Sequence, residues 1–321
     1  MMHRVKVSGA GQLGSRHLQA LQAIQSPLEI YVIDPSSQSL AVAKERFEAV
    51  SQGVAHIARF EQQALVTGLT DVAIVATSAS VRRKAIEELL KSSDIKYLVL
   101  EKLLFDEPED YPAVADLLKK KAVQAWVNCP MRVMPVYQEI KRQLGGKPIN
   151  YRVSGSQFGL VTNAIHYLDH VCDLTGCSEF VLDTSALIQS PISSKRPGFL
   201  ELNGTLTARF ADGSSCEITC YPQGSAPVVV EIFSEAHRFI VRESDGILWS
   251  SDAANNWTWK EEQCSIPYQS QITTGMVQSL LKEGTCGFTP YDVASRMHLA
   301  LLEPLGKFLG KKTGVASFPF T

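Results

Sequence analysis

The N-terminal part of the chain alternates short apolar runs with segments in which apolar residues recur every three or four positions. The apolar runs predict strands at 5–8, 30–33, 54–57, 72–76, 97–100 and 125–129. The periodic segments predict helices at 13–23, 38–50, 81–90 and 110–121. Strands that alternate with helices form a parallel sheet with crossover helices, so this part is predicted to be a doubly wound Rossmann domain.

From about residue 148 the pattern changes to closely spaced strands. Runs rich in β-branched and aromatic residues predict strands at 151–157, 185–189, 204–211, 215–221, 228–234 and 238–243. A last helix is predicted at 291–309, with Pro290 at its first turn. We therefore expect an α/β protein in which residues 1–125 form an N-terminal Rossmann doubly wound parallel sheet. Residues 126–321 are expected to form a C-terminal α+β domain built on a mostly antiparallel open sheet, with helix 290–310 packing back on the first domain.

Length and composition narrow the class of protein. A chain of 321 residues, 45% hydrophobic and 20% charged, suits two globular domains. Its net charge of −2 argues against a nucleic-acid or membrane partner, and no apolar run is long enough to span a bilayer. We expect no signal peptide, because the chain enters its first strand almost at once. Seven cysteines without a C-x-x-C pair favour reduced thiols and a cytoplasmic location, with Cys216 and Cys220 as small buried residues.

Three glycines follow the first predicted strand and precede the first predicted helix. Gly9 allows a sharp turn, Gly11 leaves room for a pyrophosphate, and Gly14 allows close packing of helix on strand. The helix that starts here would direct its backbone N–H groups and the positive end of its dipole at the phosphates. The pattern therefore predicts a dinucleotide site, with Gln12 and Leu13 beside it at the start of the helix.

Asp34 ends the second predicted strand, where a dinucleotide fold places its ribose-binding acid. Its carboxylate can accept hydrogen bonds from both ribose hydroxyls and would repel a 2′-phosphate. No Arg or Lys follows directly, so we expect NAD in preference to NADP. The alternative is that Asp34 caps the next helix. Thr77 and Ser78, at the end of a central strand, are also expected to contact the cofactor.

A predicted helix around residue 166 carries a polar arc. At 100° per residue His166, Asp169, His170 and Asp173 lie on one side, opposite an apolar stripe. These groups need water, each other, a metal or a substrate as partners, and we favour a substrate. Zinc would need a third ligand that the sequence does not show, so we expect no metal. Arg132 is predicted either to clamp an anionic substrate group or to pair with a nearby acid.

The order of these motifs resembles that of the glucose–fructose oxidoreductase / inositol dehydrogenase family, also called Gfo/Idh/MocA. The segments that carry the resemblance are the glycine motif, Ala76-Thr-Ser78, Glu101-Lys102, Asn128…Arg132…Pro135, His166-Tyr-Leu-Asp169 and Leu174-Thr-Gly176. The resemblance implies that Glu101 lies by the cofactor, that Lys102 lies by the nicotinamide and substrate, and that His166 is the general acid/base. It also implies a homodimer or homotetramer assembled through the second-domain sheet.

Two positions depart from the family pattern. Leu103 stands where the family has a proline that is often in a cis bond, and a cis bond before a non-proline residue costs about 3 kcal/mol. We therefore expect a trans bond between Lys102 and Leu103. Thr162, four residues before His166, stands where the family has an aspartate.

These observations predict an NAD(P)-dependent oxidoreductase that transfers a hydride between nicotinamide and a secondary alcohol or ketone of a sugar-like or cyclic polyol. Lys102 and His166 are the expected catalytic residues. The residues expected to bind the small-molecule substrate are Arg132, Tyr167, Asp169 and His170. The alternatives are a non-catalytic dinucleotide-binding sensor or assembly protein, which the two departures would suit, and a reductase of an imine or tetrapyrrole, which would not require His166.

Overall fold

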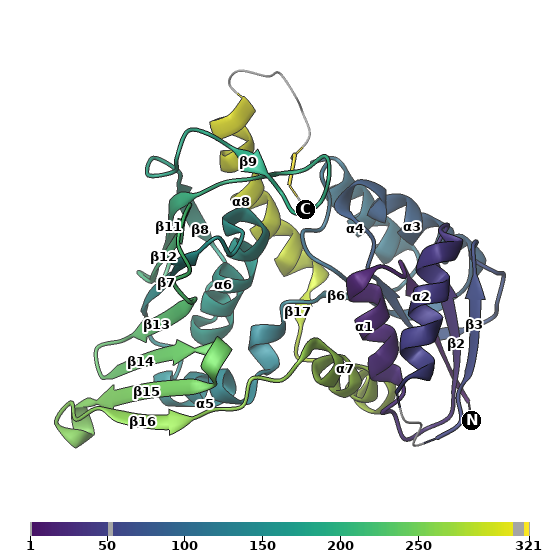
Figure 1. Ribbon diagram of the computed structural model, residues 1–321, viewed down its shortest axis with the longest axis horizontal. Coiled ribbons are helices and arrows are strands. Elements are labelled where there is room, and N and C mark those ends of the chain that lie inside the picture. Colours follow the sequence, from purple (N-terminus) through teal and green to yellow (C-terminus); the bar gives the residue numbers. More distant parts are fainter. Residues whose placement is uncertain (1, 51–53, 311–317, 321) are drawn as a thin grey trace. The chain divides into compact units, whose positions relative to one another are not determined.

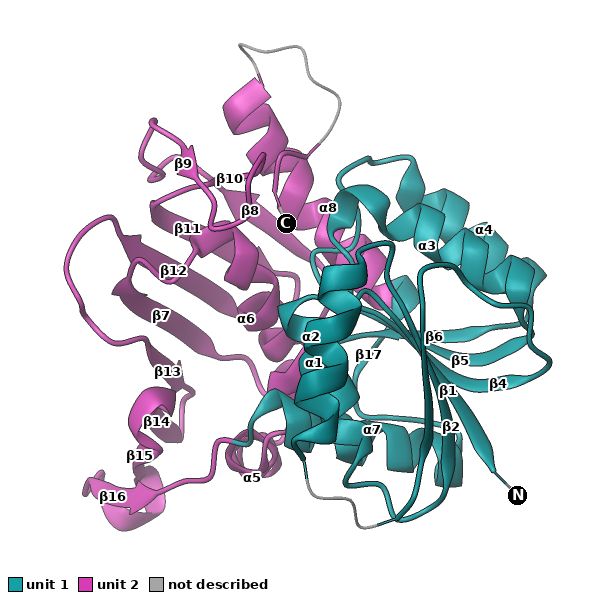
Figure 2. Cartoon of the chain, turned by 45° about the vertical axis from the view of Figure 1, so that its right-hand side comes forward, with its two compact units in different colours: residues 1–128, 267–292 teal, residues 129–266, 293–321 magenta. Residues whose placement is uncertain are grey.

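The computed structural model describes residues 2–50, 54–310 and 318–320, in two compact units (Figures 1 and 2). Unit 1 comprises Met1–Asn128 and Pro267–Asp292, and unit 2 comprises Cys129–Ile266 and Val293–Thr321. The sequence-based division had left residues 267–292 in the second domain, whereas in the structure they group with the first. That helix 290–310 packs back on the first domain stays a prediction.

Unit 1 is built on a seven-stranded sheet. Its strands are β1 (His3–Ser8), β2 (Leu28–Ile33), β3 (Ile57–Glu61), β4 (Thr70–Val75), β5 (Ile95–Leu100), β6 (Gln124–Val127) and β17 (Thr289–Pro290). They lie in the order β17-β6-β5-β4-β1-β2-β3, and every pair is parallel except β17 with β6. Because both faces of a parallel sheet are covered, central residues such as Val5, Val72 and Ile74 are fully buried. The predicted Rossmann sheet is confirmed.

The helices of unit 1 cover that sheet on both faces. They are α1 (Gln12–Leu21), α2 (Ser37–Glu48), α3 (Ala79–Ser92), α4 (Asp110–Lys120) and α7 (Gln269–Glu283). Strand order reverses beside β1, and crossovers are right-handed, so α1 and α2 lie on one face while α3 and α4 lie on the other. Helix α7 packs beside α1 (Figure 1). The reversal point beside β1 is where ligands bind in such sheets.

Unit 2 is built on an eight-stranded sheet. Its strands are β7 (Asn150–Ser156), β8 (Phe180–Asp183), β11 (Gly204–Phe210), β12 (Ser215–Tyr221), β13 (Val229–Phe233), β14 (His237–Arg242), β15 (Ile247–Asp252) and β16 (Lys260–Gln263). The order is β16-β15-β14-β13-β7-β12-β11-β8, and β7 with β12 is the one parallel pair among the strands described. This confirms the predicted mostly antiparallel open sheet. Cys216 and Cys220 are buried, as expected.

The helices of unit 2 bury one face of this sheet. They are α5 (Pro135–Leu144), α6 (Leu160–Thr175) and α8 (Tyr291–Gly310), which belongs to unit 2 from Val293 onward, with a 3₁₀ turn, η1 (Pro130–Val133), before α5. Helix α6 lies against β12, as Figure 2 shows. Its inner residues, among them Val161, Ile165 and Leu168, are fully buried. A two-stranded ribbon of β9 (Ile192–Ser193) and β10 (Leu200–Glu201) completes the unit.

Several predicted elements were wrong. The strand expected at 54–57 is β3, which begins only at Ile57, and the strand expected at 185–189 is a loop that follows β8. The sequence analysis missed α5, α7, β15 and β16. All four residues of β16 are exposed and polar. This edge strand therefore lacks the alternation of apolar and polar residues from which a strand is predicted. Among the described helices, none is long and apolar enough to cross a membrane.

Candidate functional site

The glycine turn between β1 and α1 has the geometry that the sequence predicted. Gly9 has a φ of 94°, and a Cβ there would lie 2.9 Å from the carbonyl carbon of Ala76. A Cβ on Gly14 would lie 1.8 Å from the carbonyl oxygen of Gly9. A Cβ on Gly11, by contrast, would meet nothing within 4 Å. Gly9 and Gly14 are therefore required by the protein itself, whereas Gly11 borders open space that a phosphate can approach.

Helix α1 presents its N-terminus to that space. Gly11 is its N-cap residue, and no side chain of the described residues caps it. The first helical hydrogen bond uses the N–H of Ser15, so the amide groups of Gln12, Leu13 and Gly14 lie in the uncapped first turn. An uncapped helix N-terminus is a favourable position for an anion. Gln12 and Leu13 begin this helix, and their expected contact with a pyrophosphate stays a prediction.

Asp34 joins the end of β2 to the glycine turn. Its Oδ2 accepts a hydrogen bond of 2.7 Å from the N–H of Ala10, and its Oδ1 accepts one of 2.8 Å from the N–H of Ser36. It does not cap α2, because Ser36 does so by accepting from the N–H of Ser39. A carboxylate has about four acceptor positions, so Asp34 retains capacity for two ribose hydroxyls.

A cavity of about 740 Å³ opens at the carboxyl ends of β1, β2 and β4. Gly9, Asp34 and Thr77 line it together, with residues of α3 and of the segment after β3. The Oγ1 atom of Thr77 is buried and has no hydrogen-bond partner among the described residues. Ser78 follows directly as the N-cap residue of α3. The cavity volume is typical of small-molecule sites, and the unpartnered hydroxyl and the open space at Gly11 both fit a dinucleotide.

Glu101 is not among the residues that line this cavity, and its expected cofactor role stays a prediction. It is 3% exposed, and its Oε1 is 2.8 Å from Nε2 of His17 and 2.6 Å from the donating Nδ2 of Asn128. Burial alone raises the pKa of Glu101, but these hydrogen bonds outweigh burial and hold its pKa below the usual value. His17 also bonds Thr273 of α7 through Nδ1. The carboxylate of Glu101 thus links the end of β5 to α1 and to the end of β6, and His17 extends this link to α7. No sequence signal singled out His17.

Lys102 follows in a half-buried turn, and the expectation of a trans bond to Leu103 was wrong: this peptide bond is cis. The expectation considered only the intrinsic preference of an isolated peptide, whereas Leu103 is fully buried in the surrounding fold. Arg82 of α3, also fully buried, donates hydrogen bonds to the carbonyl groups of Leu103 and Leu104. It also donates to the carbonyl oxygen of Thr77, at the cavity.

In unit 2 the polar arc of α6 binds protein rather than presenting free charges. Arg132 of η1 binds Asp169 through two hydrogen bonds, Nε to Oδ2 at 2.6 Å and Nη2 to Oδ1 at 2.9 Å. Asp173 lies 3.2 Å from Arg132 and 2.7 Å from Nζ of Lys141. Arg132 and Asp169 are thus buried partners of each other, and their expected substrate roles stay predictions. The ion pair of Arg132 with Asp169 is one of the two alternatives that the sequence left open for Arg132.

His170 is also a structural residue. It is fully buried, its Nδ1 is 2.8 Å from the hydroxyl of Tyr151, and its ring contacts that of Tyr137 at a centroid distance of 4.3 Å. Burial, together with the nearby positive charges of Arg132 and Lys141, lowers the pKa of His170 to about 3. Its contacts are therefore those of a buried neutral imidazole, and its expected substrate role stays a prediction.

His166 and Tyr167 lie nearer the start of α6. His166 is half-buried. Tyr167 is 9% exposed, and burial raises its pKa above the usual value, so it is a poor acid at neutral pH. Lys102 belongs to unit 1 and His166 to unit 2. Sequence reasoning missed the carboxylate of Glu201, which accepts hydrogen bonds from the first turn of α6. Forty residues separate Glu201 from Val161, so no local pattern could connect them.

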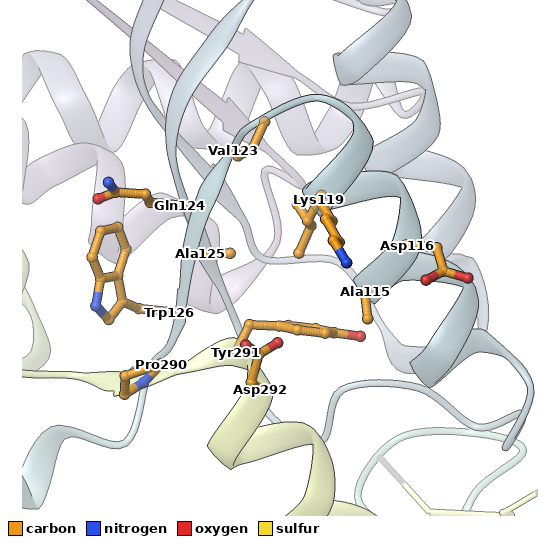
Figure 3. A pocket seen from close by; sticks show the side chains of 11 residues that line it. Ala115, Asp116, Lys119, Val123, Gln124, Ala125, Trp126, Pro290, Tyr291 and Asp292 are labelled. Carbon is orange, nitrogen blue, oxygen red and sulfur yellow. The ribbon is translucent and has the colours of Figure 1, made fainter.

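A second cavity, of about 510 Å³, opens at the edge of the unit 1 sheet (Figure 3). Tyr291 lies at its centre, with Trp126 and Pro290 on one side and Lys119 and Asp116 on the other. It contains none of the predicted site residues. Among the described residues, no group of three or more His, Cys, Asp or Glu side chains is placed to hold a metal.

Comparisons with known proteins place this geometry in context. UDP-N-acetylglucosamine 3-dehydrogenase from Acidithiobacillus ferrooxidans is similar in structure, with a TM-score of 0.71, 14% identity and coverage of 94% of this chain and 96% of that one. An Agrobacterium radiobacter oxidoreductase in complex with NAD⁺, L-tartaric acid and magnesium has a TM-score of 0.72 and 14% identity, covering 94% of each chain. A biliverdin reductase from Synechocystis has a TM-score of 0.71 and 14% identity, covering 96% of this chain and 99% of that one. At such identity these likenesses concern the fold.

Sequence comparison adds the family. No curated protein matches the chain in sequence. Residues 3–129 match the model of an oxidoreductase family with an NAD-binding Rossmann fold. These residues include the glycine turn, Asp34 and Thr77, which together form the cavity described above. Residues 3–129 are therefore identified with the Gfo/Idh/MocA family of NAD-binding oxidoreductases, and NAD is the cofactor that this match indicates.

Proposed function

We propose that this protein is an NAD-dependent dehydrogenase or reductase that acts on a secondary alcohol or ketone of a sugar-like or cyclic polyol. The observation that supports it most strongly is the cavity at the reversal point of the unit 1 sheet. There Gly9 of the glycine turn, the carboxylate of Asp34 and the unpartnered hydroxyl of Thr77 line one cavity.

On the cofactor side, each residue has a distinct task. The amide groups of Gln12 and Leu13 bind the pyrophosphate at the N-terminus of α1. Asp34 accepts hydrogen bonds from the adenosine ribose and repels the 2′-phosphate of NADP. When bound, NAD supplies the hydride acceptor or donor for the reaction. The protein provides position and electrostatics.

On the substrate side, His166 exchanges the hydroxyl proton, and Lys102 polarises the substrate oxygen. The environment of α6 favours His166 for the proton transfer. Asp169 is held in an ion pair, His170 stays neutral with a pKa of about 3, and burial raises the pKa of Tyr167. Among these residues of α6, His166 is therefore the one that we assign to proton transfer near neutral pH.

The substrate class follows from the proton transfer and from one structural relative. A histidine acid/base suits a hydroxyl or carbonyl oxygen, and the relative from Acidithiobacillus ferrooxidans is a sugar-nucleotide dehydrogenase by its title. We also propose a cytoplasmic homodimer or homotetramer assembled through the unit 2 sheet. Exposed aromatic residues on that unit, such as Tyr221 and Trp259, suit an interface.

The test is NADH formation, followed by absorbance, with NAD and a panel of sugars, inositols and nucleotide sugars. Wild type, His166→Ala and the control His3→Ala are compared, because His3 lies on β1 and is not one of the predicted site residues. We expect turnover that is lost in His166→Ala and kept in His3→Ala. NAD binding measured by calorimetry without turnover on any substrate would instead favour a sensor or assembly protein. Turnover that survives His166→Ala would favour an imine or tetrapyrrole reductase.

A further inference from the structure

The N-terminus of α6 is occupied by a carboxylate from a distant part of the chain. Glu201, in the short strand β10, is 6% exposed. Its Oε1 accepts hydrogen bonds from the N–H groups of Val161 at 2.6 Å and of Leu202 at 2.9 Å. Its Oε2 accepts from Thr162 twice, from the N–H at 3.1 Å and from the hydroxyl at 2.7 Å. Four donors thus surround one buried carboxyl group.

The backbone before α6 is shaped to admit this carboxylate. Gly159, the N-cap residue, has a φ of 83°, and no side chain of the described residues caps the helix in the usual way. A Cβ on Gly159 would lie 3.2 Å from Oε2 of Glu201. A larger residue would therefore be strained and would press on the carboxylate. The positive end of the α6 dipole further stabilises the negative charge.

Thr162 brings this charge close to His166. Residues four apart on a helix lie one above the other, with their Cβ atoms about 6 Å apart. The hydroxyl of Thr162 holds Oε2 of Glu201 at 2.7 Å. A buried carboxylate is therefore anchored to the side chain that lies one turn before the imidazole on the same face of α6.

Glu201 is the carboxylate that contacts the first turn of α6, and the other acids near this helix have partners of their own. Arg132 of η1 compensates Asp169, and Lys141 of α5 compensates Asp173. Glu243, which follows β14, accepts a hydrogen bond from Tyr137 of α5, and burial raises its pKa. Burial shifts the remaining titratable groups near the helix toward their uncharged forms, as it does Cys172 of α6. They are Tyr137 of α5, Tyr151 of β7, and Cys216 and Cys220 of β12, with pKa values raised by burial, and His170 and Tyr167 of α6 itself. No ion pair of Glu201 occurs among the described residues.

We propose that Glu201 is a positioning residue for His166 and acts through Thr162. The anchored carboxylate favours the imidazolium form and keeps a proton on His166 that can pass to the substrate oxygen. This inference rests on the proposed function for its catalytic meaning. Its electrostatic content, a bias of His166 toward the protonated form, can be measured without any substrate.

The test is an NMR pH titration of the imidazole Cε1–H of His166 in the full chain, assigned by its absence in His166→Ala. Wild type is compared with Glu201→Gln and with the control Glu217→Gln. Glu217 is exposed on β12, and its substitution removes the same charge as Glu201→Gln. We expect Glu201→Gln to lower the pKa of His166 by about 0.5–1 unit, and Glu217→Gln to leave it unchanged. An unchanged pKa in folded Glu201→Gln overturns the proposal.

A second variant separates the link through Thr162 and guards against misfolding. Thr162→Val removes the hydroxyl and leaves the three backbone donors to Glu201, so α6 keeps its cap. We expect a smaller shift in the same direction. No shift in Thr162→Val would overturn the part of the proposal that assigns the link to Thr162.

Turnover gives an independent readout. In Glu201→Gln we expect the pH profile of kcat/KM to move to lower pH while the affinity for NAD stays unchanged. A merely structural role would lower the rate without moving the profile. If no substrate is turned over at all, the proposed function fails, and the NMR titration still decides the role of Glu201.

Discussion

Gly11 and Gly14 offer opposite tests of the glycine turn, although both belong to one motif. A methyl group on Gly11 meets no protein atom within 4 Å, and the φ of −65° at this position suits alanine. Gly11→Ala should therefore cost about 1 kcal/mol of stability or less, the amount expected for an alanine at an N-cap. A methyl group on Gly14 would lie 1.8 Å from the backbone oxygen of Gly9. Because backbone cannot move aside as a side chain can, Gly14→Ala should cost about 3 kcal/mol or more.

We expect Gly11→Ala to weaken NAD binding although it barely changes the stability of the protein. In Gly11→Ala the new methyl group occupies the space that a pyrophosphate needs, so we expect the Kd for NAD to rise at least about tenfold, or about 1.4 kcal/mol. The assays are thermal unfolding without cofactor and isothermal titration with NAD. A Gly11→Ala protein that binds NAD as tightly as wild type would refute the placement of the pyrophosphate. A Gly14→Ala protein of wild-type stability would refute the packing argument.

Three further predictions follow from single contacts. Asp34→Ala removes the charge that repels a 2′-phosphate, so the ratio of NADP to NAD affinity should rise by about tenfold or more in isothermal titration. The pKa of His170 is lower in the folded protein than in the unfolded chain, so the unfolded chain binds the extra proton and stability falls as pH drops from about 6.5 toward 3. Urea unfolding of His170→Gln between these pH values should show a slope smaller by about 1.4 kcal/mol per pH unit, and an unchanged slope would contradict the assignment. Arg132→Met removes the guanidinium that pairs with the buried carboxylate of Asp169 and should cost about 3–5 kcal/mol in urea unfolding, more than Arg132→Met with Asp169→Leu.

The Rossmann half of the molecule was predictable because its signals are local. Buried parallel strands such as Thr70–Val75 are nearly continuous apolar runs, and the glycine motif marks one turn within a few residues. Asp34 followed from its place at the end of β2. Helix α7 carried the periodic signal too, with Ile272, Met276 and Leu280 on its buried face, but polar residues around them hid it.

The second half of the site depended on long-range contacts that no local pattern records. Periodicity showed correctly that His166, Asp169 and His170 share an arc of α6, but not what packs against that arc. Arg132 and Tyr151, from η1 and β7, occupy most of it. Glu201 reaches the N-terminus of the same helix from forty residues away.

The central claim is hydride transfer to bound NAD, and isotope transfer tests it most directly. The protein is incubated with NAD and with inositols and hexoses that carry deuterium at the carbinol carbons, and the reduced cofactor is analysed by mass spectrometry. We expect the reduced cofactor to carry one deuterium, and we expect no deuterated cofactor with His166→Ala. Bound NAD that gains no deuterium from any of these substrates would contradict it.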